Sequence, residues 1–311
     1  MKYQILFKRM LGVGLMLALL TGCTASAMPA PTPMPPTSTS IPPGLAPTPT
    51  TNILIQTLMI GDYQYVMECN GEGSPAVLLF GGRAANWKPI LTEIKVSTRT
   101  CLFEHAGSRS TPLTAEEIAK NVHVLLNEAE ITGPYVVVGF SVGGYIARVF
   151  TDLYPEEVVG TALLDASHED QNARFLATLP PESSGDCQEL KDYRTELQGH
   201  NFLPIGPEIT LDFDASATEV REIGTGLGNL PLVVLTAGRS EWPDCFPQEV
   251  RQQLDQAWLE MQNDLANLST NSTHLLAEES GHSFAEQPEM VIDAIRRAVQ
   301  AAQTGVTDTV P

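Results

Sequence analysis

The chain has 311 residues, and its 37 acidic side chains outnumber its 18 basic ones, which gives a formal net charge of −19. Such a charge argues against nucleic acid and against anionic lipid headgroups as partners, because both would be repelled. We expect a monomer that acts on a small-molecule substrate.

The first 22 residues are typical of an export signal. Basic residues precede an apolar run over 10–20, which is too short to span a bilayer. The run ends in Leu-Thr-Gly followed by Cys23, a pattern that resembles the lipobox of bacterial lipoproteins. That resemblance implies lipidation of Cys23, and contact with the extracytoplasmic face of a bacterial cell-envelope membrane through this lipid anchor alone. An ordinary signal peptide cut after Ala25 or Ala27 is the alternative.

The rest of the chain divides by composition. Residues 23–50 consist largely of Pro, Thr, Ser, Ala and Met, cannot bury enough surface to fold, and are expected to form a disordered tether. Residues 51–303 are long enough for one large domain and contain no internal repeat. Residues 304–311 are expected to form a disordered tail.

Eight short segments of the domain have the composition of strands, and several read as buried on both faces. They are Ile53–Met59, Tyr65–Cys69, Ala76–Phe80, Thr100–Glu104, Tyr135–Val138, Thr161–Leu164, Leu232–Thr236 and Thr273–Ala277. The first two have no helix between them and are expected to pair as a hairpin.

Helical patterns separate the later strands. One is opened by a capping box at Thr114–Glu117, one covers 145–153, an amphipathic one spans 250–268, and the last spans 288–302. Because alternating strands and helices form parallel sheets, the order predicts an α/β fold with a mostly parallel eight-stranded sheet flanked by helices. Residues 168–229 are too long for a simple crossover and are interpreted as a cap inserted over the strand ends.

The most informative motif is Gly139-Phe140-Ser141-Val142-Gly143, which lies between a predicted strand and a predicted helix. A serine in such a sharp turn presents its hydroxyl at the edge of the sheet, and glycines are needed where neighbouring backbone passes close by. A G-x-S-x-G pattern alone is weak evidence, but in this context it indicates that Ser141 is a nucleophile.

A serine hydroxyl needs a base to take its proton and a carboxylate to orient that base. His282 follows the last predicted strand, at the same edge as Ser141, and is the best candidate for the base. Two acids compete to orient it: Glu241, which is favoured, and Asp165. Each follows a strand at the same edge, and Asp244 is a weaker third choice.

Backbone amides should hold the oxyanion of the tetrahedral intermediate. Val142 follows the nucleophile, and Gly82 lies in the turn after another strand, so both are candidates. Apolar Phe80 and Phe140 suggest an apolar acyl pocket. Two further residues are candidates for substrate binding, namely Arg83 and His105.

Four cysteines remain after the signal, an even number that favours disulfides in an exported protein. Of the three possible pairings we expect Cys69 with Cys101, and Cys187 with Cys245. No spacing among them resembles a zinc site, and we expect neither a metal nor a cofactor.

Residues 55–303 resemble the α/β-hydrolase superfamily, through the elbow at Ser141, the loop after Phe80, and the chain order serine, acid, histidine. The resemblance is to the capped esterase and peptidase-like branch, and it implies a metal-free Ser-His-acid hydrolase acting on esters, amides or lactones. The chain departs from the family pattern where Phe80 and Phe140 replace frequent histidines, which puts the substrate in doubt. The alternatives are a ligand-binding module without turnover, and perhydrolase or lyase chemistry on the same scaffold.

Overall fold

The computed structural model describes residues 53–61, 63–82, 84–106, 111–206, 209–224, 226–239 and 241–307, with the backbone alone at 84–86, 105–106 and 206. The expected signal and tether, the lipidation site Cys23, the side chain of Arg83 and the end of the tail lie outside the described residues. Within the described part, no helix combines the length and the apolar character that crossing a membrane requires.

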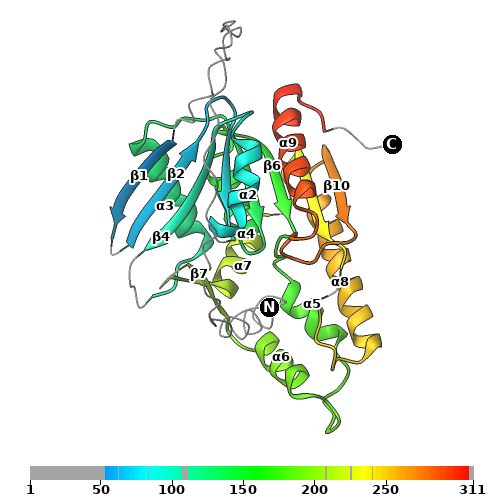
Figure 1. Ribbon diagram of the computed structural model, residues 1–311. Helices are drawn as coiled ribbons and strands as arrows, with labels where there is room; N and C mark the ends of the chain where they lie inside the picture. The colour runs from blue at the N-terminus through cyan, green and yellow to red at the C-terminus, as the bar shows by residue number, and fades with distance from the viewer. Residues whose placement is uncertain are drawn as a thin grey trace, which may run out of the picture. The chain divides into compact units, whose positions relative to one another are not determined.

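The core of the domain is an eight-stranded sheet in the spatial order β1-β2-β4-β3-β5-β6-β9-β10 (Figure 1). Pairing is antiparallel between β1 and β2 and between β2 and β4, and parallel everywhere else. The mostly parallel sheet and its N-terminal hairpin are therefore confirmed. The strands are β1 Ile53–Ile60, β2 Tyr63–Asn70, β3 Ala76–Phe80, β4 Thr100–Ala106, β5 Tyr135–Phe140, β6 Val158–Leu164, β9 Leu232–Ala237 and β10 Ser272–Ala277.

Helices cover both faces of this sheet. The helices α2 (Ala84–Ile94) and α9 (Pro288–Thr304) pack on one face, where their apolar side chains share a core with alternate residues of the central strands. The helices α3 (Ala115–Glu128), α4 (Gly143–Leu153) and α8 (Gln248–Ala266) pack on the other. This alternation explains why the central strands are apolar throughout.

The predicted start of α3 is present in detail. The Thr114 side chain accepts a hydrogen bond from the Glu117 amide (3.3 Å), and the Glu117 carboxylate accepts one from the Thr114 amide (3.0 Å). This reciprocal pair satisfies two amides that a helix start leaves without intrahelical acceptors. By contrast, the sequence did not predict α2, which lacks acidic residues in its first turn and contains Pro89.

The segment between β6 and β9 is more ordered than its composition indicated. It contains α5 (Gln171–Thr178), α6 (Gln188–Gln198), the strand pair β7 (Phe202–Gly206) and β8 (Ile209–Asp212), and α7 (Phe213–Glu222). In Figure 1, α5 and α6 extend beyond the lower end of the sheet. The helix α5 packs against α8, and α7 packs against α4.

Two disulfides join distant parts of the chain, in the pairing that the sequence led us to expect. Cys69 and Cys101 lie directly opposite each other on β2 and β4 and are bonded. Cys187, at the start of α6, is bonded to Cys245 in the loop after β9. The second bond ties the inserted segment to the loop that leads into α8.

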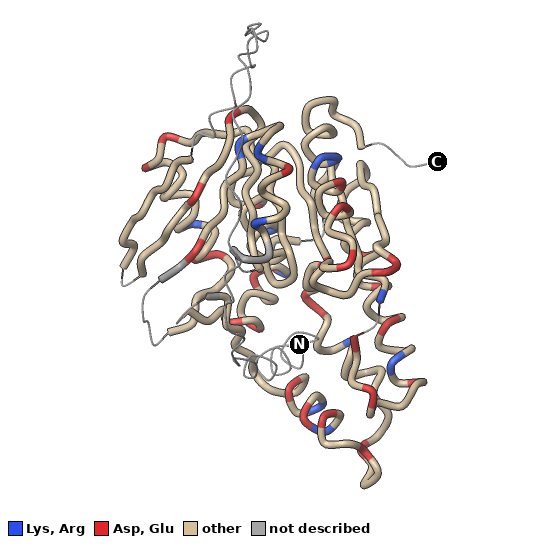
Figure 2. Tube along the Cα trace, viewed as in Figure 1, with Lys and Arg blue, Asp and Glu red and all other residues tan. Residues whose placement is uncertain are grey.

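The folded domain extends further toward the C-terminus than the sequence indicated. The helix α9 continues to Thr304, and the buried Thr307 bonds to the side-chain oxygen of Asn271 through its amide at 2.9 Å and its hydroxyl at 2.8 Å. Figure 2 shows that acidic residues are scattered over many elements of the domain. This distribution fits a solubilising surface better than one acidic binding patch.

Candidate active site

Ser141 lies in the sharp turn between β5 and α4. Its φ angle of 58° falls in the left-handed region, which side-chain-bearing residues rarely adopt. Its amide donates to the carbonyl of Leu164 (3.1 Å) and its carbonyl accepts from the amide of Ser167 (2.9 Å). The last residue of β6 and the loop that follows it therefore hold the strained turn by backbone hydrogen bonds.

The glycines of the motif are required by close backbone contacts. A Cβ atom on Gly143 would lie 2.3 Å from the carbonyl oxygen of Phe80, at the end of β3. A Cβ atom on Gly139 would lie 2.7 Å from the Cα atom of Gly144. Real Cβ atoms do not approach backbone atoms so closely, so the turn can form only without side chains at these positions.

His282 and Asp165 lie side by side at the same edge of the sheet. The imidazole Nδ1 is 2.6 Å from Asp165 Oδ2, although the two residues are 117 positions apart. Asp165 is completely buried and His282 is 8% exposed. A carboxylate can only accept, so this contact requires a proton on Nδ1 and leaves Nε2 as the basic nitrogen.

The second oxygen of the Asp165 carboxylate is also hydrogen-bonded. Its Oδ1 accepts from the indole N–H of Trp258 (2.8 Å) and from the amide of Ala237 (3.1 Å). These donors offset the cost of burying the charge. The sequence marked Trp258 only as an apolar residue of an amphipathic helix, because nothing in a local pattern shows where an indole N–H points.

Glu241 occupies a different position from the one that the sequence favoured. Its Oε2 accepts a hydrogen bond from the backbone amide of His282 (2.8 Å) and is not the partner of the ring. The preference for Glu241 over Asp165 is therefore wrong for the imidazole contact. The weaker candidate Asp244 has a side chain that is 95% exposed and lies 3.9 Å from Arg251.

The imidazole of His282 is also held by a ring contact. It stacks on the ring of Phe140 with a centroid distance of 4.7 Å and an interplanar angle of 18°. Phe140 directly precedes Ser141, so this stacking positions the imidazole next to the serine turn. Phe140 was predicted as a wall of the substrate pocket, and it is half-buried.

The turn after β3 approaches the same edge. The indole N–H of Trp87 donates to the carbonyl of Gly81 (2.7 Å), and both Gly81 and Gly82 have positive φ angles, 79° and 71°. The carbonyl and the following amide of a trans peptide point in opposite directions, so this bond turns the Gly82 amide away from Trp87. Val142 lies at the start of α4, where amides have no intrahelical acceptor.

Three further residues were expected to bind substrate. Phe80 is 3% exposed and its ring packs between Phe103 and Phe150 at centroid distances of 5.6 and 5.7 Å. It is a core residue, because the strand alternation turns its side chain toward α4, and the expectation that it lines a pocket is wrong. Arg83 and the side chain of His105 lie outside the described residues.

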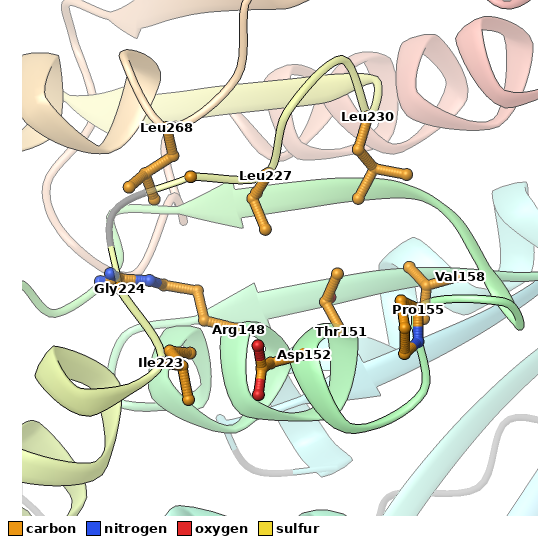
Figure 3. Close-up of a pocket in the computed structure, with 11 residues that line it drawn as sticks. Arg148, Thr151, Asp152, Pro155, Val158, Ile223, Gly224, Leu227, Leu230 and Leu268 are labelled. Carbon is orange, nitrogen blue, oxygen red and sulfur yellow. The ribbon is translucent and has the colours of Figure 1, made fainter.

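Two pockets differ in size and position. A small one of about 20 Å³ lies within the core on the face that α2 and α9 cover, and it is lined by Trp87, Ile90, Phe140, Leu164, Ser283, Phe284 and Val291. A larger one of about 300 Å³ lies along the second half of α4. Figure 3 shows Leu227, Leu230 and Leu268 facing this helix across it. None of the candidate catalytic residues Ser141, Asp165 and His282 lines either pocket, so neither pocket is assigned to the Ser141 turn.

A buried ion pair joins α4 to the loop that begins at Asp165. Arg148 of α4, which is 2% exposed, donates from both terminal nitrogens to the Glu169 carboxylate, at 2.6 and 3.1 Å. Burial alone would raise the pKa of Glu169, but the hydrogen bonds and charge of Arg148 outweigh it and hold the pKa at about 2. Burial lowers the pKa of the neighbouring His168. The ion pair therefore ties α4 to the loop that follows β6.

Comparison with known proteins gives distant matches in sequence. No protein-family model matches the chain. It is 25% identical to the uncharacterized protein YqjL of Bacillus subtilis over 223 residues, which cover 70% of this chain and 79% of that protein. It is 28% identical over 111 residues to vanchrobactin synthetase VabF of Vibrio anguillarum, a stretch that covers 35% of this chain and 4% of that protein.

Solved structures match more of the chain. A probable hydrolytic enzyme from Pseudomonas aeruginosa is 17% identical with a TM-score of 0.52, covering 81% of this chain and 95% of that one. Mouse alpha/beta hydrolase domain-containing protein 10 is 15% identical with a TM-score of 0.50, covering 78% and 97%. A bacterial membrane phospholipase A is 15% identical with a TM-score of 0.51, covering 81% and 87%. With its sheet order, the chain therefore has the α/β-hydrolase fold.

Proposed function

We propose that this protein is a serine hydrolase in which Ser141 is the nucleophile, His282 the general base and Asp165 the acid that orients it. The observation that carries the proposal is the 2.6 Å contact between Asp165 Oδ2 and His282 Nδ1, with the imidazole stacked on the residue before Ser141. The hydrolytic names of structural neighbours add support from analogy of fold.

Each step follows from these groups. Nε2 of His282 takes the proton of Ser141 Oγ as the oxygen attacks the carbonyl carbon of the substrate. The imidazolium that forms is stabilised by the Asp165 carboxylate. It then gives the proton to the leaving group, and water attacks the acyl-enzyme with the same base. The buried carboxylate needs no reorganisation during these steps, because three donors already hold it.

The amides of Val142 and Gly82 are proposed to bind the oxyanion. Val142 is the N-cap residue of α4, and the Gly82 amide is turned away from Trp87 by the bond to the Gly81 carbonyl. Removing one such donor from a comparable site costs about 3 kcal/mol of transition-state stabilisation.

The proposed substrates are esters, amides or lactones with a small apolar acyl group, cleaved by a carboxylesterase or peptidase-like activity. The half-buried ring of Phe140 beside the imidazole is the apolar surface that supports this choice. The protein is proposed to work outside the cytoplasm, anchored by lipid at Cys23, and its two disulfides are consistent with export.

The proposal is tested with the S141A variant and short aryl esters. We expect a loss of turnover of at least about 10³-fold with a melting temperature close to that of the wild type, because removing one hydroxyl leaves the fold intact. A fluorophosphonate probe should label Ser141 of the wild type and not the variant. Undiminished turnover in S141A would refute the proposal, and an unlabelled wild type would favour a binding module.

A further inference from the structure

The loops after β9 and β10 remain hydrogen-bonded beyond the ends of the two strands. The amide of Gly238 donates to the carbonyl of Ala277 (2.8 Å), and the amide of Arg239 donates to the carbonyl of Ser280 (2.9 Å). Further along, the donor is the amide of His282 and the acceptor is the side chain of Glu241, at 2.8 Å. A carboxylate therefore holds the backbone at the residue that carries the imidazole.

The chain makes room for this carboxylate. A Cβ atom on Gly281 would lie 2.5 Å from Glu241 Oε1 and 2.6 Å from its Cδ atom, and the three nearest atoms to such a Cβ all belong to Glu241. The φ angle of Gly281 is not positive. Its lack of a side chain is therefore required for the approach of Glu241 and not for an unusual turn.

A second carboxylate supports the preceding amide. Glu286 Oε2 lies 3.4 Å from the amide nitrogen of Gly281, and the other oxygen of Glu286 pairs with Arg239. The amides of Gly281 and His282 thus point to carboxylates from two different loops. Charge-assisted hydrogen bonds are short and strong, and of these two contacts only the 2.8 Å bond to Glu241 has the length of such a bond.

We propose that Glu241 is a positioning residue, whose carboxylate fixes the backbone of His282 so that the imidazole is held between Asp165 and Phe140. The inference rests on the proposed function of Ser141 and His282. It assigns to Glu241 a role that acts through the main chain, separate from that of the acid on the ring. A displacement of about 1 Å at a reacting group can lower a rate about 100-fold, so such an anchor affects turnover without touching the substrate.

Three single variants distinguish the loss of the hydrogen-bond acceptor at Glu241 from the loss of its negative charge. E241A removes the acceptor, and kcat for a short aryl ester should fall about 10- to 100-fold with KM changed less than about twofold. E241Q keeps an oxygen that can accept the same amide, so its kcat should stay within about threefold of the wild type. E278A removes an exposed carboxylate from the same loop as His282 and serves as the matched control, with unchanged kcat.

A double-mutant cycle with G281A tests the contact itself. The added methyl group should displace the Glu241 carboxylate and lower kcat about as much as E241A does. In the double variant G281A/E241A there is no carboxylate to displace, so kcat should be no lower than in E241A alone. Additive losses, an equal loss in E241Q and E241A, or an unchanged kcat in E241A would each overturn the proposal.

Hydrogen exchange of the His282 amide provides a readout that does not depend on activity. Exchange should be at least about tenfold faster in E241A and G281A than in the wild type, E241Q and E278A, because only the first two lose the acceptor. Equal exchange in all five proteins would refute the anchor. If the wild type is not labelled by a fluorophosphonate, the proposed function fails, but the exchange measurement still decides whether Glu241 holds this amide.

Discussion

The indole N–H of Trp258 on α8 donates a 2.8 Å hydrogen bond to Asp165 Oδ1 at the end of β6. The same carboxylate bonds to His282 through its other oxygen. The helix α8 is therefore connected to the imidazole through a single buried side chain. This arrangement makes the orientation of the acid dependent on a residue of a different element, 93 positions away in the sequence.

The W258F variant should weaken both stability and turnover. Phenylalanine keeps most of the aromatic packing but removes one donor to a buried carboxylate oxygen, at a cost of about 1–3 kcal/mol in the free energy of unfolding. We also expect kcat to fall several-fold because Asp165 is less firmly oriented. Urea unfolding and steady-state kinetics measure the two effects.

Y135F provides the matched control for W258F. The Tyr135 hydroxyl donates to the Ile131 carbonyl (2.6 Å) in a buried position at the start of β5, at the opposite end of the strand from Ser141. This variant should lose stability while keeping kcat. If W258F loses stability and keeps full turnover, the indole does not orient the acid.

The D165N variant should lower kcat/KM about 10³- to 10⁴-fold, because an asparagine neither fixes the histidine tautomer nor stabilises the imidazolium as the carboxylate does. E241Q should lose far less activity, since its contact is with the backbone amide of His282. Steady-state kinetics of both variants on one ester decides between the two acids. A greater loss in E241Q than in D165N would assign the ring-orienting role to Glu241.

The G143A variant should fold poorly. The new methyl group would collide with the backbone of Phe80 and Gly81, and relieving such overpacking costs about 1–3 kcal/mol or more. Alanine is the better helix former, so helix propensity alone would predict the opposite sign. In the G185A control, the nearest atom to the added Cβ is 3.7 Å away, and stability should be nearly unchanged. Thermal unfolding of the pair compares the two effects, and equal melting temperatures would contradict the proposed backbone contact.

Acid should remove the stability that Glu169 contributes. Its folded pKa of about 2 lies below its ordinary value of 4.5, since Arg148 outweighs the burial that by itself would raise the pKa. A depressed carboxyl pKa stabilises the folded state above the unfolded pKa, and this contribution is lost as pH falls from about 4.5 toward 2. The difference in unfolding free energy between the wild type and E169Q should therefore be greatest above pH 5 and shrink by pH 3. Urea midpoints across this range measure it, and a constant difference would contradict the assigned ion pair.

The sequence by itself determined the fold and the turn that carries Ser141. Strand composition, the capping box at Thr114 and the G-x-S-x-G pattern of the elbow are local signals, since each depends on residues only a few positions apart. The same local logic indicated His282, which follows a strand that ends at the same edge of the sheet. It missed α2 and the short strands β7 and β8, whose sequences carry weak patterns.

Only the tertiary structure decided which carboxylate meets the imidazole. Asp165 and Glu241 both follow strands at the same edge, so strand order cannot separate them. The paths of two loops bring one carboxylate to Nδ1 and the other to the backbone amide of the same histidine. The physical reason is that hydrogen bonding requires positions correct to a few tenths of an ångström, and here such positions arise from contacts between residues that lie 117 and 41 positions apart.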